Sequence, residues 1–430
     1  MLSSFGPQNE KLILRFNSIF PALLFVLFGV AELVYFTING KGNDFPIFYE
    51  ASKLTLALKS PWDSVSDPVY SAYLNGPITS VLISPLGLVD QDLALGLVRF
   101  LTIAVVPYLA FQTSNLFFPD LALNPLDRKF WLISTFVLLS FPIRANLEYG
   151  QMFLLFAALA VSSLRLAQSN SPVQLFVSGL LIGVCCDYKP QSFLIFSLLI
   201  CFSKPLIFIG GATSILIGGL ASSALTSNFP YATWVEVLQK RMGGGARTGD
   251  QMHLYSLTLN AFLTTILVVL LSSTVVALAI SNRGIRNLGR PQILSLVIFT
   301  VTLFAPWMHS TDLVFFSLYA VILYFTHSLS WTSSLSIGTF LVWSNNLVVS
   351  AFVVFAALFL VLVSQRMTPL LKYRSIFLVV IPSIIFPLTV FISPSLEESH
   401  RKWWGLLGIY LVTLFSAGLR IKPEVEPARK

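Results

Sequence analysis

Charged residues are scarce in this sequence. They make up 11% of the 430 residues, whereas hydrophobic residues make up 55%. A soluble globular protein carries roughly 25% charged residues, so a chain this poor in charge cannot keep most of its surface in water. We therefore predict an all-α, polytopic integral membrane protein in which residues 1–430 form a single membrane domain.

Cysteine is also rare. The three cysteines, Cys185, Cys186 and Cys201, lie inside or beside apolar runs and lack Cys-x-x-Cys spacing. This pattern indicates neither a disulfide framework nor a cysteine-based zinc site. The net charge of +8 could attract acidic partners, but the basic residues stand in short clusters between apolar runs. We interpret these clusters as topology signals and expect no nucleic-acid partner.

Long apolar runs are abundant. Since about 20 apolar residues cross the hydrocarbon layer, the runs predict about 12–14 transmembrane helices. They lie near residues 16–38, 95–118, 130–144, 151–167, 173–186, 191–203, 206–225, 256–280, 292–305, 312–327, 331–343, 346–363, 375–393 and 403–419. Residues 77–89 are apolar but number only about 13, and Pro85 interrupts them, so we predict a re-entrant or interfacial helix there.

Basic residues predict the orientation, because Lys and Arg concentrate on the cytoplasmic side of membrane proteins. With Lys11 and Arg15 inside, the later basic clusters also fall inside, provided that residues 77–89 do not cross. We expect a multi-pass protein with cytoplasmic N- and C-termini. Together with the absence of a targeting signal, this bias favours the plasma (inner) membrane of a bacterium.

Two outward segments are far longer than the usual connectors of about 2–8 residues. They are the first extracytoplasmic loop, residues 39–92, and the second, residues 228–255. Both mix aromatic residues with charges, unlike typical disordered segments. Apolar residues of 44–59 share one face, which predicts an interfacial helix in the first loop.

Ionisable and amide side chains collect near the predicted outer ends of the helices. They are Asp44, Glu148, Gln151, Asp187, Lys189, His309 and Asp312. A carboxylate base beside cations that hold a phosphate would form a reaction centre, so a catalytic site at this face is one interpretation.

Structural alternatives exist for these residues. Asp44 can cap the following helix, Lys189 can reach lipid headgroups, and His309 can belong to an aromatic belt. Glu148 can be an ordinary interfacial acid, and Arg144 can pair with a carboxylate, as can Arg99.

Several short motifs occur in a consistent order. The first loop begins with Asp44-Phe45-Pro46 and continues to Pro77 and Pro85-Leu86, and the later motifs are Pro142 with Gly150-Gln151, Tyr188-Lys189-Pro190 and Pro306-Trp307-Met308-His309. This arrangement resembles glycosyltransferase family 87, membrane-embedded enzymes of the GT-C type that include polyprenyl-phosphate-mannose-dependent mannosyltransferases. The resemblance covers about residues 44–312.

The resemblance implies a GT-C-like fold and a hexosyltransferase. Such an enzyme transfers a hexose, mannose foremost, from a polyprenyl-phosphate donor to a lipid or glycan acceptor at the extracytoplasmic face, with inversion. It implies that Asp44 is the catalytic base. The lipid-linked donor is then a co-substrate, membrane lipids surround the protein, and neither a cofactor nor a divalent metal is expected.

Further roles follow from the chemistry of such a transfer. The leaving phosphate needs cations, for which the candidates are Lys189, His309 and Arg144. Sugar and acceptor hydroxyls need amide, carboxylate and aromatic partners, for which the candidates are Glu148, Gln151, Tyr49, Tyr73 and Trp234.

Three alternatives remain open. One is a purely structural or scaffold protein, although such a protein would not require Asp44, Lys189 and His309 to lie on one side. A transporter or lipid flippase would also have many spans, but transporters place coupling charges at mid-bilayer and show two similar halves, neither of which is evident here. A GT-C-like polymer ligase would carry its large outer loop late in the chain, whereas the large loops here come first and in mid-chain.

Overall fold

The computed structural model describes residues 7–40, 42–62, 73–117, 121, 123–189, 205–226, 230–243 and 310–325. Every regular element in these ranges is helical. In chain order they are α1 (Pro7–Asn39), α2 (Phe45–Leu56), α3 (Pro77–Ile83), the 3-10 helix η1 (Ser84–Leu88), α4 (Gln91–Phe117), α5 (Arg128–Leu138), α6 (Phe141–Tyr149), α7 (Phe153–Leu166), α8 (Pro172–Tyr188), α10 (Pro205–Thr226), α11 (Pro230–Gly243), the 3-10 helix η3 (Ser310–Leu313) and α15 (Val314–Phe325).

The all-α, polytopic prediction is confirmed. Within the described ranges, three helices are long and apolar enough to cross a membrane: α1, α4 and α10, and a bent pair of helices makes a fourth candidate. The predicted spans at 191–203, 256–280, 292–305, 331–343, 346–363, 375–393 and 403–419 lie outside the described residues.

Helix α1 shows how the chain meets lipid. Large apolar side chains such as Leu23, Leu27 and Val30 stay more than half exposed along it. Its other face packs against α4, α5 and α6. A helix that exposes this much apolar surface is stable only in an apolar solvent, so this face is suited to contact the hydrocarbon layer.

The predicted span at 130–144 is wrong as a single straight helix. The structure breaks it into α5 and α6, which meet at an angle of 55°. Pro142 lies in the first turn of α6, where it lacks the N–H that would continue the α5 hydrogen-bond ladder. The break directs the end of α6 toward the ends of α1 and α8.

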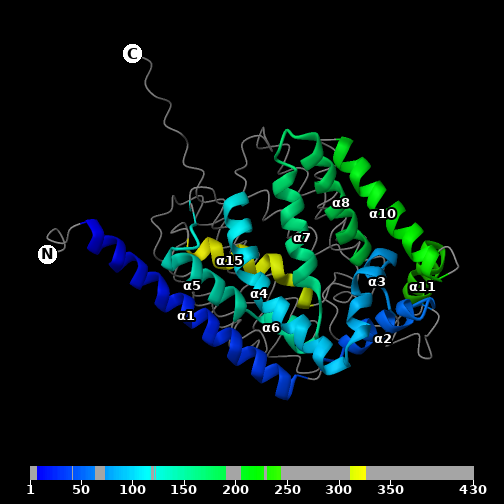
Figure 1. The fold of residues 1–430 in the computed structure, drawn as a ribbon, viewed down its shortest axis with the longest axis horizontal. Coiled ribbons are helices and arrows are strands. Elements are labelled where there is room, and N and C mark those ends of the chain that lie inside the picture. Colours follow the sequence, from blue (N-terminus) through cyan, green and yellow to red (C-terminus); the bar gives the residue numbers. More distant parts are fainter. Residues whose placement is uncertain are drawn as a thin grey trace, which may run out of the picture.

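Helices α8 and α10 lie side by side (Figure 1). Glycines allow this contact, because a Cβ on Gly179 would lie 2.1 Å from the Ile207 carbonyl oxygen and a Cβ on Gly210 would lie 2.2 Å from that of Phe176. Small residues at helix crossings let backbones approach closely in membranes.

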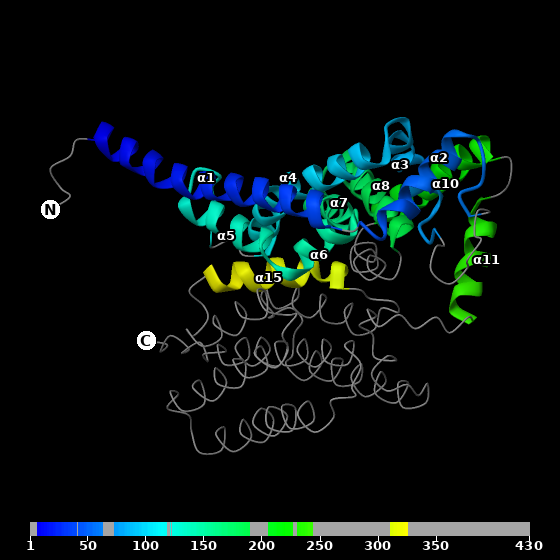
Figure 2. The ribbon, with the colours of Figure 1, turned by 90° about the horizontal axis from the view of Figure 1, so that it is seen from below.

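The loop helices gather at one end of the longer helices. Helices α2 and α3 lie beyond the end of α1 that is opposite to the N-terminus, α11 lies further out in contact with α10 and α3, and α15 lies beneath α5 (Figure 2). Residues 77–89, predicted as one re-entrant or interfacial helix, form α3 followed by η1, which ends at Leu88, and Pro85 lies in the first turn of η1. The change from α to 3-10 geometry occurs where proline removes a donor.

Candidate functional site

The backbone positions Asp44 against the end of α6. The N–H of Gly42 donates to the carbonyl oxygen of Glu148 at 2.9 Å, and the N–H of Asp44 donates to that of Tyr149 at 3.2 Å. Because these bonds use only main-chain atoms, they fix the position of Asp44 without occupying its carboxylate.

Gly150 makes this approach possible. It ends α6 with φ +70, in the left-handed region that favours glycine. A Cβ at this position would lie 2.7 Å from both the Phe45 Cβ and the Leu95 Cδ1. The segment that carries Asp44 can therefore lie directly on the α6–α7 turn.

Arg99 of α4 contacts the ends of both α1 and α6. Its Nε donates to the Leu147 carbonyl oxygen at 2.9 Å and its Nη2 donates to that of Gly40 at 3.3 Å. The side chain is buried. Arg99 therefore binds the last turns of α1 and α6, through carbonyl groups rather than through the carboxylates considered from the sequence.

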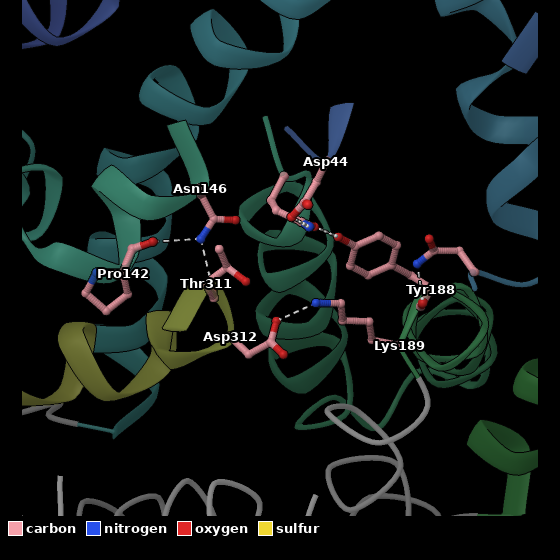
Figure 3. Close-up of polar contacts among 9 residues, drawn as sticks. Asp44, Pro142, Asn146, Tyr188, Lys189, Thr311 and Asp312 are labelled. Atoms are coloured by element: carbon pink, nitrogen blue, oxygen red, sulfur yellow. Dashed lines mark hydrogen bonds and ion pairs between the residues drawn. The ribbon is translucent and has the colours of Figure 1, made fainter. Parts of the chain in front are cut away.

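The side chains of Asp44, Gln151 and Tyr188 form a hydrogen-bonded chain (Figure 3). The Nε2 of Gln151 donates to Oδ2 of Asp44 at 2.6 Å, and the Tyr188 hydroxyl donates to Oε1 of Gln151 at 3.2 Å. Asp44 is half-buried, whereas Tyr188 is fully buried. Asp44 occupies the N-cap position of α2, as the structural alternative expected, but its side chain makes no capping bond and its carboxylate is not used for that purpose.

Lys189 follows Tyr188 and pairs with Asp312 of η3 (Figure 3). Its Nζ lies 2.7 Å from Asp312 Oδ1, and the Asp312 side chain has no exposed surface. The ammonium also lies over the Phe153 and Tyr188 rings, 5.5 Å and 5.8 Å from their centroids. A lysine enclosed by a carboxylate and two rings is not a lipid-facing anchor.

Asn146 of α6 holds η3 beside this site. Its Nδ2 donates to the carbonyl oxygens of Pro142 at 2.7 Å and Thr311 at 2.8 Å. The second bond places Asp312, one residue further on, within reach of Lys189. His309 lies outside the described residues, directly before η3.

A second polar cluster joins the two loops to α8. The buried carboxylate of Asp187 accepts bonds on Oδ2 from the Thr79 N–H at 2.8 Å and the Thr79 hydroxyl at 2.9 Å. Its Oδ1 accepts the Tyr231 hydroxyl of α11 at 3.2 Å. Gly76 and Asn75 donate to the carbonyl oxygens of Asp187 and Tyr188, at 2.8 Å and 2.6 Å. Asp187 thus ties α3 and α11 to the residues that precede Lys189.

Three of the other predicted site residues have contacts of their own. Arg144 Nε lies 3.2 Å from Glu32 of α1, and the guanidinium is 5.7 Å from the Phe36 ring centroid. The Tyr49 hydroxyl donates to the Val89 carbonyl oxygen at 2.9 Å, and Trp234 Nε1 donates to that of Leu74 at 2.8 Å. Glu148 is exposed. The structure does not bring these side chains into the Asp44–Gln151–Tyr188 chain.

The Tyr73 ring packs against two other aromatic rings. Its centroid lies 6.4 Å from that of Phe48, in an edge-on arrangement, and 6.1 Å from that of Trp62. Its buried hydroxyl has no hydrogen-bond partner in the part of the chain that the structure describes. Burial raises the pKa of Tyr73 well above its usual value, and the nearby Asp187 adds to the shift. The hydroxyl therefore stays protonated and can donate to a substrate oxygen.

Tyr188, Asp312 and Asp187 complete the site but were not among the predicted binding residues. Tyr188 stands next to Lys189 in the sequence motif, and Asp312 stands three residues after His309. Proximity in sequence was the available signal for both. No sequence pattern indicates that Asp187 would receive bonds from Thr79, 108 residues away.

The chain contains one Asp-x-Asp sequence, Asp90-Gln91-Asp92, of the kind that holds a metal in many nucleotide-sugar enzymes. Asp90 Oδ1 accepts the Leu93 N–H at 2.8 Å and so caps α4. Within the described ranges, no three His, Cys, Asp or Glu side chains group as a metal site requires. The expectation that no metal takes part stays a prediction.

Comparison with protein families gives one match. The model of glycosyltransferase family 87 matches residues 73–323, more than half of the chain. The matched range contains Gln151, Tyr188 and Lys189 and begins after Asp44. Comparison with curated proteins and with solved structures gives no match. On this evidence the chain belongs to glycosyltransferase family 87 and is a membrane glycosyltransferase.

Proposed function

We propose that this protein transfers a hexose, with mannose as the first candidate, from a polyprenyl-phosphate donor to a hydroxyl group of a lipid or glycan acceptor. The proposed reaction inverts the anomeric centre, takes place at the extracytoplasmic face of the plasma membrane in a GT-C-like fold, and uses Asp44 as the base. Membership in a glycosyltransferase family favours this function over the transporter alternative.

The proposal rests on the hydrogen bonding and burial of the Asp44 carboxylate. Gln151 is the only side chain of the described residues that hydrogen bonds to it, on Oδ2. Asp44 is half-buried and does not cap α2. A carboxylate with one oxygen held, and the other without a partner in the described ranges, can accept a proton from an acceptor hydroxyl.

In the proposed transfer, one bond to the anomeric carbon forms while another breaks. The acceptor oxygen attacks the anomeric carbon as its proton passes to Asp44. The bond between that carbon and the phosphate oxygen breaks, and its electron pair leaves with the phosphate. One displacement at one carbon inverts the configuration, so Asp44 acts as a base and not as a nucleophile.

Lys189 is the proposed partner of the leaving phosphate. An ammonium has three N–H donors, so Lys189 can keep its bond to Asp312 and still donate to a phosphate oxygen. The low exposure of its side chain, 12%, strengthens that interaction, because little water screens it. His309 remains a proposed second cation from the residues that precede η3.

The remaining predicted contacts carry less of the proposal. Tyr73 offers a buried hydroxyl without a partner among the residues that the structure describes, and Glu148 is exposed beside the Asp44 segment. Arg144, Tyr49 and Trp234 hold structural partners, and the proposal does not depend on any of them. The proposed partners are the lipid-linked donor, the acceptor and membrane lipids, without a metal ion.

A lipid-linked donor also fits the location of the site. Asp44 follows the end of α1, and Lys189 follows the end of α8, so both lie at helix ends. A polyprenyl chain lies among the lipid tails, and its phosphate stays at the level of the headgroups. The reacting atoms then meet the base without leaving the membrane surface.

Sugar transfer by the purified protein tests the proposal. Polyprenyl-phosphate mannose and polyprenyl-phosphate glucose are offered as donors, with a nucleotide-linked hexose as the control donor and membrane lipid extract as the acceptor. We expect transfer from a polyprenyl-phosphate donor, loss of transfer in Asp44→Asn, and normal transfer in the matched control Asp90→Asn.

Two outcomes contradict the proposal. Equal transfer by the wild type and Asp44→Asn would rule out Asp44 as the base. Transfer by the wild type only from the nucleotide-linked hexose would rule out the lipid-linked donor. The anomeric configuration of the product, determined by NMR, checks inversion.

A further inference from the structure

The amide of Gln151 lies between Asp44 and the buried Tyr188. We infer that Tyr188 is a positioning residue, which acts through Gln151 to hold Oδ2 of Asp44 and to leave Oδ1 as the oxygen that receives the proton. The inference rests on the proposed function for the identity of the reaction, but the hydrogen-bonded chain itself belongs to the structure.

The chemistry of the three groups permits one arrangement. An ionised carboxylate only accepts hydrogen bonds, so the –NH2 end of Gln151 must face Asp44, at 2.6 Å. The amide oxygen then faces the Tyr188 hydroxyl at 3.2 Å and can only accept. The hydroxyl of Tyr188 is thereby the donor, and it determines which end of the amide turns toward Asp44.

Tyr188 is itself held firmly. Its side chain has no exposed surface, and its ring stacks on Phe156 with centroids 3.9 Å apart and an angle of 1° between the planes. Its carbonyl oxygen accepts the Asn75 side chain at 2.6 Å. A tyrosine fixed at both ring and backbone cannot turn its hydroxyl away from Gln151 without loss of packing.

The two oxygens of Asp44 therefore have different roles. A proton on Oδ2 would point at the N–H of Gln151, whereas Oδ1 has no hydrogen-bond partner in the described part of the chain. The proton of the acceptor hydroxyl passes to Oδ1, and the Gln151 bond to Oδ2 stays in place during the transfer.

Loss of the Tyr188 hydroxyl would remove this control. The amide could then rotate by half a turn and present its oxygen to Asp44. An amide oxygen accepts a bond only from the protonated acid, so this rotation favours the form of Asp44 that cannot act as a base.

The first test is a double-mutant cycle on transfer kinetics. We expect Tyr188→Phe to lower kcat about tenfold, the equivalent of one hydrogen bond, with KM changed less than about twofold. Because Tyr188 acts through Gln151, the double variant Tyr188→Phe/Gln151→Leu should be no slower than Gln151→Leu alone. Tyr108→Phe is the matched control, since it removes a hydroxyl that contacts Ser162 at 2.6 Å between α4 and α7.

The second test needs no sugar transfer. An apolar carbodiimide modifies protonated carboxyl groups, and the modified peptide that contains Asp44 is quantified by mass spectrometry at one fixed pH. We expect the labelling of Asp44 to be several-fold faster in Tyr188→Phe than in the wild type and in Tyr108→Phe. Asp44→Asn identifies the signal, because it removes the reactive group.

The outcomes separate the inference from the proposed function. Additive effects in the double variant, or labelling of Asp44 at the wild-type rate in Tyr188→Phe, would overturn the positioning role of Tyr188. Faster labelling in a protein that transfers no hexose from a polyprenyl phosphate would support the positioning role while contradicting the proposed reaction.

Discussion

Asp44 follows the end of α1, and Asp187 lies near the end of α8. The two aspartates differ in the number of hydrogen bonds that their carboxylates receive. Asp44 is half-buried, and its carboxylate receives a single bond, from Gln151. Asp187 is buried, and its carboxylate receives the Thr79 N–H, the Thr79 hydroxyl and the Tyr231 hydroxyl. Residue type and location alone do not distinguish the two aspartates, so the number of bonds to each carboxylate is the basis on which we propose a chemical role for Asp44 and a structural role for Asp187.

The means of attachment explains this difference. Main-chain bonds from Gly42 and Asp44 to the end of α6 fix the Asp44 segment, so its side chain stays available. The α3 segment is fixed by the Asp187 side chain, which binds the first turn of α3. We therefore expect substitutions near Asp44 to change the rate of transfer and substitutions near Asp187 to change stability.

After the loss of transfer expected for Asp44→Asn, the largest effect is expected from Asp44→Glu, which keeps the charge but moves the carboxylate by about one methylene group. Misplacement of a reacting group by about 1 Å can cost roughly 100-fold in rate. We expect kcat to fall by about that factor while the melting temperature stays within experimental error. Full activity in this variant would show that the position of the carboxylate is not critical.

Gly76→Ala should have the next largest effect, on stability. A Cβ at this position would lie 2.3 Å from Asp187 Oδ1, so the α3 segment or the carboxylate must shift. Overpacking of this kind costs about 1–3 kcal/mol. We expect a lower melting temperature in detergent, and Gly96→Ala is the control, because a Cβ there meets nothing within 4 Å.

Thr79→Val should be milder, because it removes one bond to Asp187 and leaves the bond from the Thr79 backbone. We expect a loss of about 1 kcal/mol in the free energy of unfolding. Thr79→Ser keeps the hydroxyl and should recover most of that loss. A stability equal to that of the wild type in Thr79→Val would mean that the hydroxyl contributes nothing to the attachment of α3.

Arg144→Gln should have the smallest effect if Arg144 only pairs with Glu32. The Arg144 side chain is 42% exposed, so water screens much of this ion pair, and such pairs contribute about 0.2–1 kcal/mol. We expect a small change in melting temperature and a KM for the lipid-linked donor within about twofold of the wild type. A much larger KM would instead support the predicted contact between Arg144 and the donor phosphate.

The sequence predicts much of the fold, for a physical reason. Apolar runs must match the thickness of the hydrocarbon layer, so the helices now seen as α4 and α10 could be read with bounds correct to within a few residues, and the end of α1 likewise. The start of α1 was missed, because the helix begins at Pro7, before the apolar run. The 55° break between α5 and α6 was missed, because a proline within an apolar run can occupy the first turn of a new helix as well as kink a single one.

The site could be predicted only in part. The predicted topology places Asp44, Gln151 and Lys189 at helix ends on one side of the membrane, since each follows or precedes a span. It cannot predict that Lys189 pairs with Asp312 or that Arg144 turns toward α1, because these contacts join residues more than 100 positions apart. Such pairings depend on the angles between helices, which apolar periodicity does not encode.

The most direct test of this account compares Asp44→Asn with Asp187→Asn, because each substitution replaces one carboxylate oxygen by an –NH2 group. Transfer of labelled hexose from a polyprenyl phosphate and the melting temperature are measured on the same preparations. We predict that Asp44→Asn loses transfer and melts like the wild type. We predict that Asp187→Asn melts at a lower temperature but, at a temperature where it remains folded, retains transfer. The reverse pattern, with Asp44→Asn active and Asp187→Asn stable but inactive, would contradict the assignment of the base to Asp44.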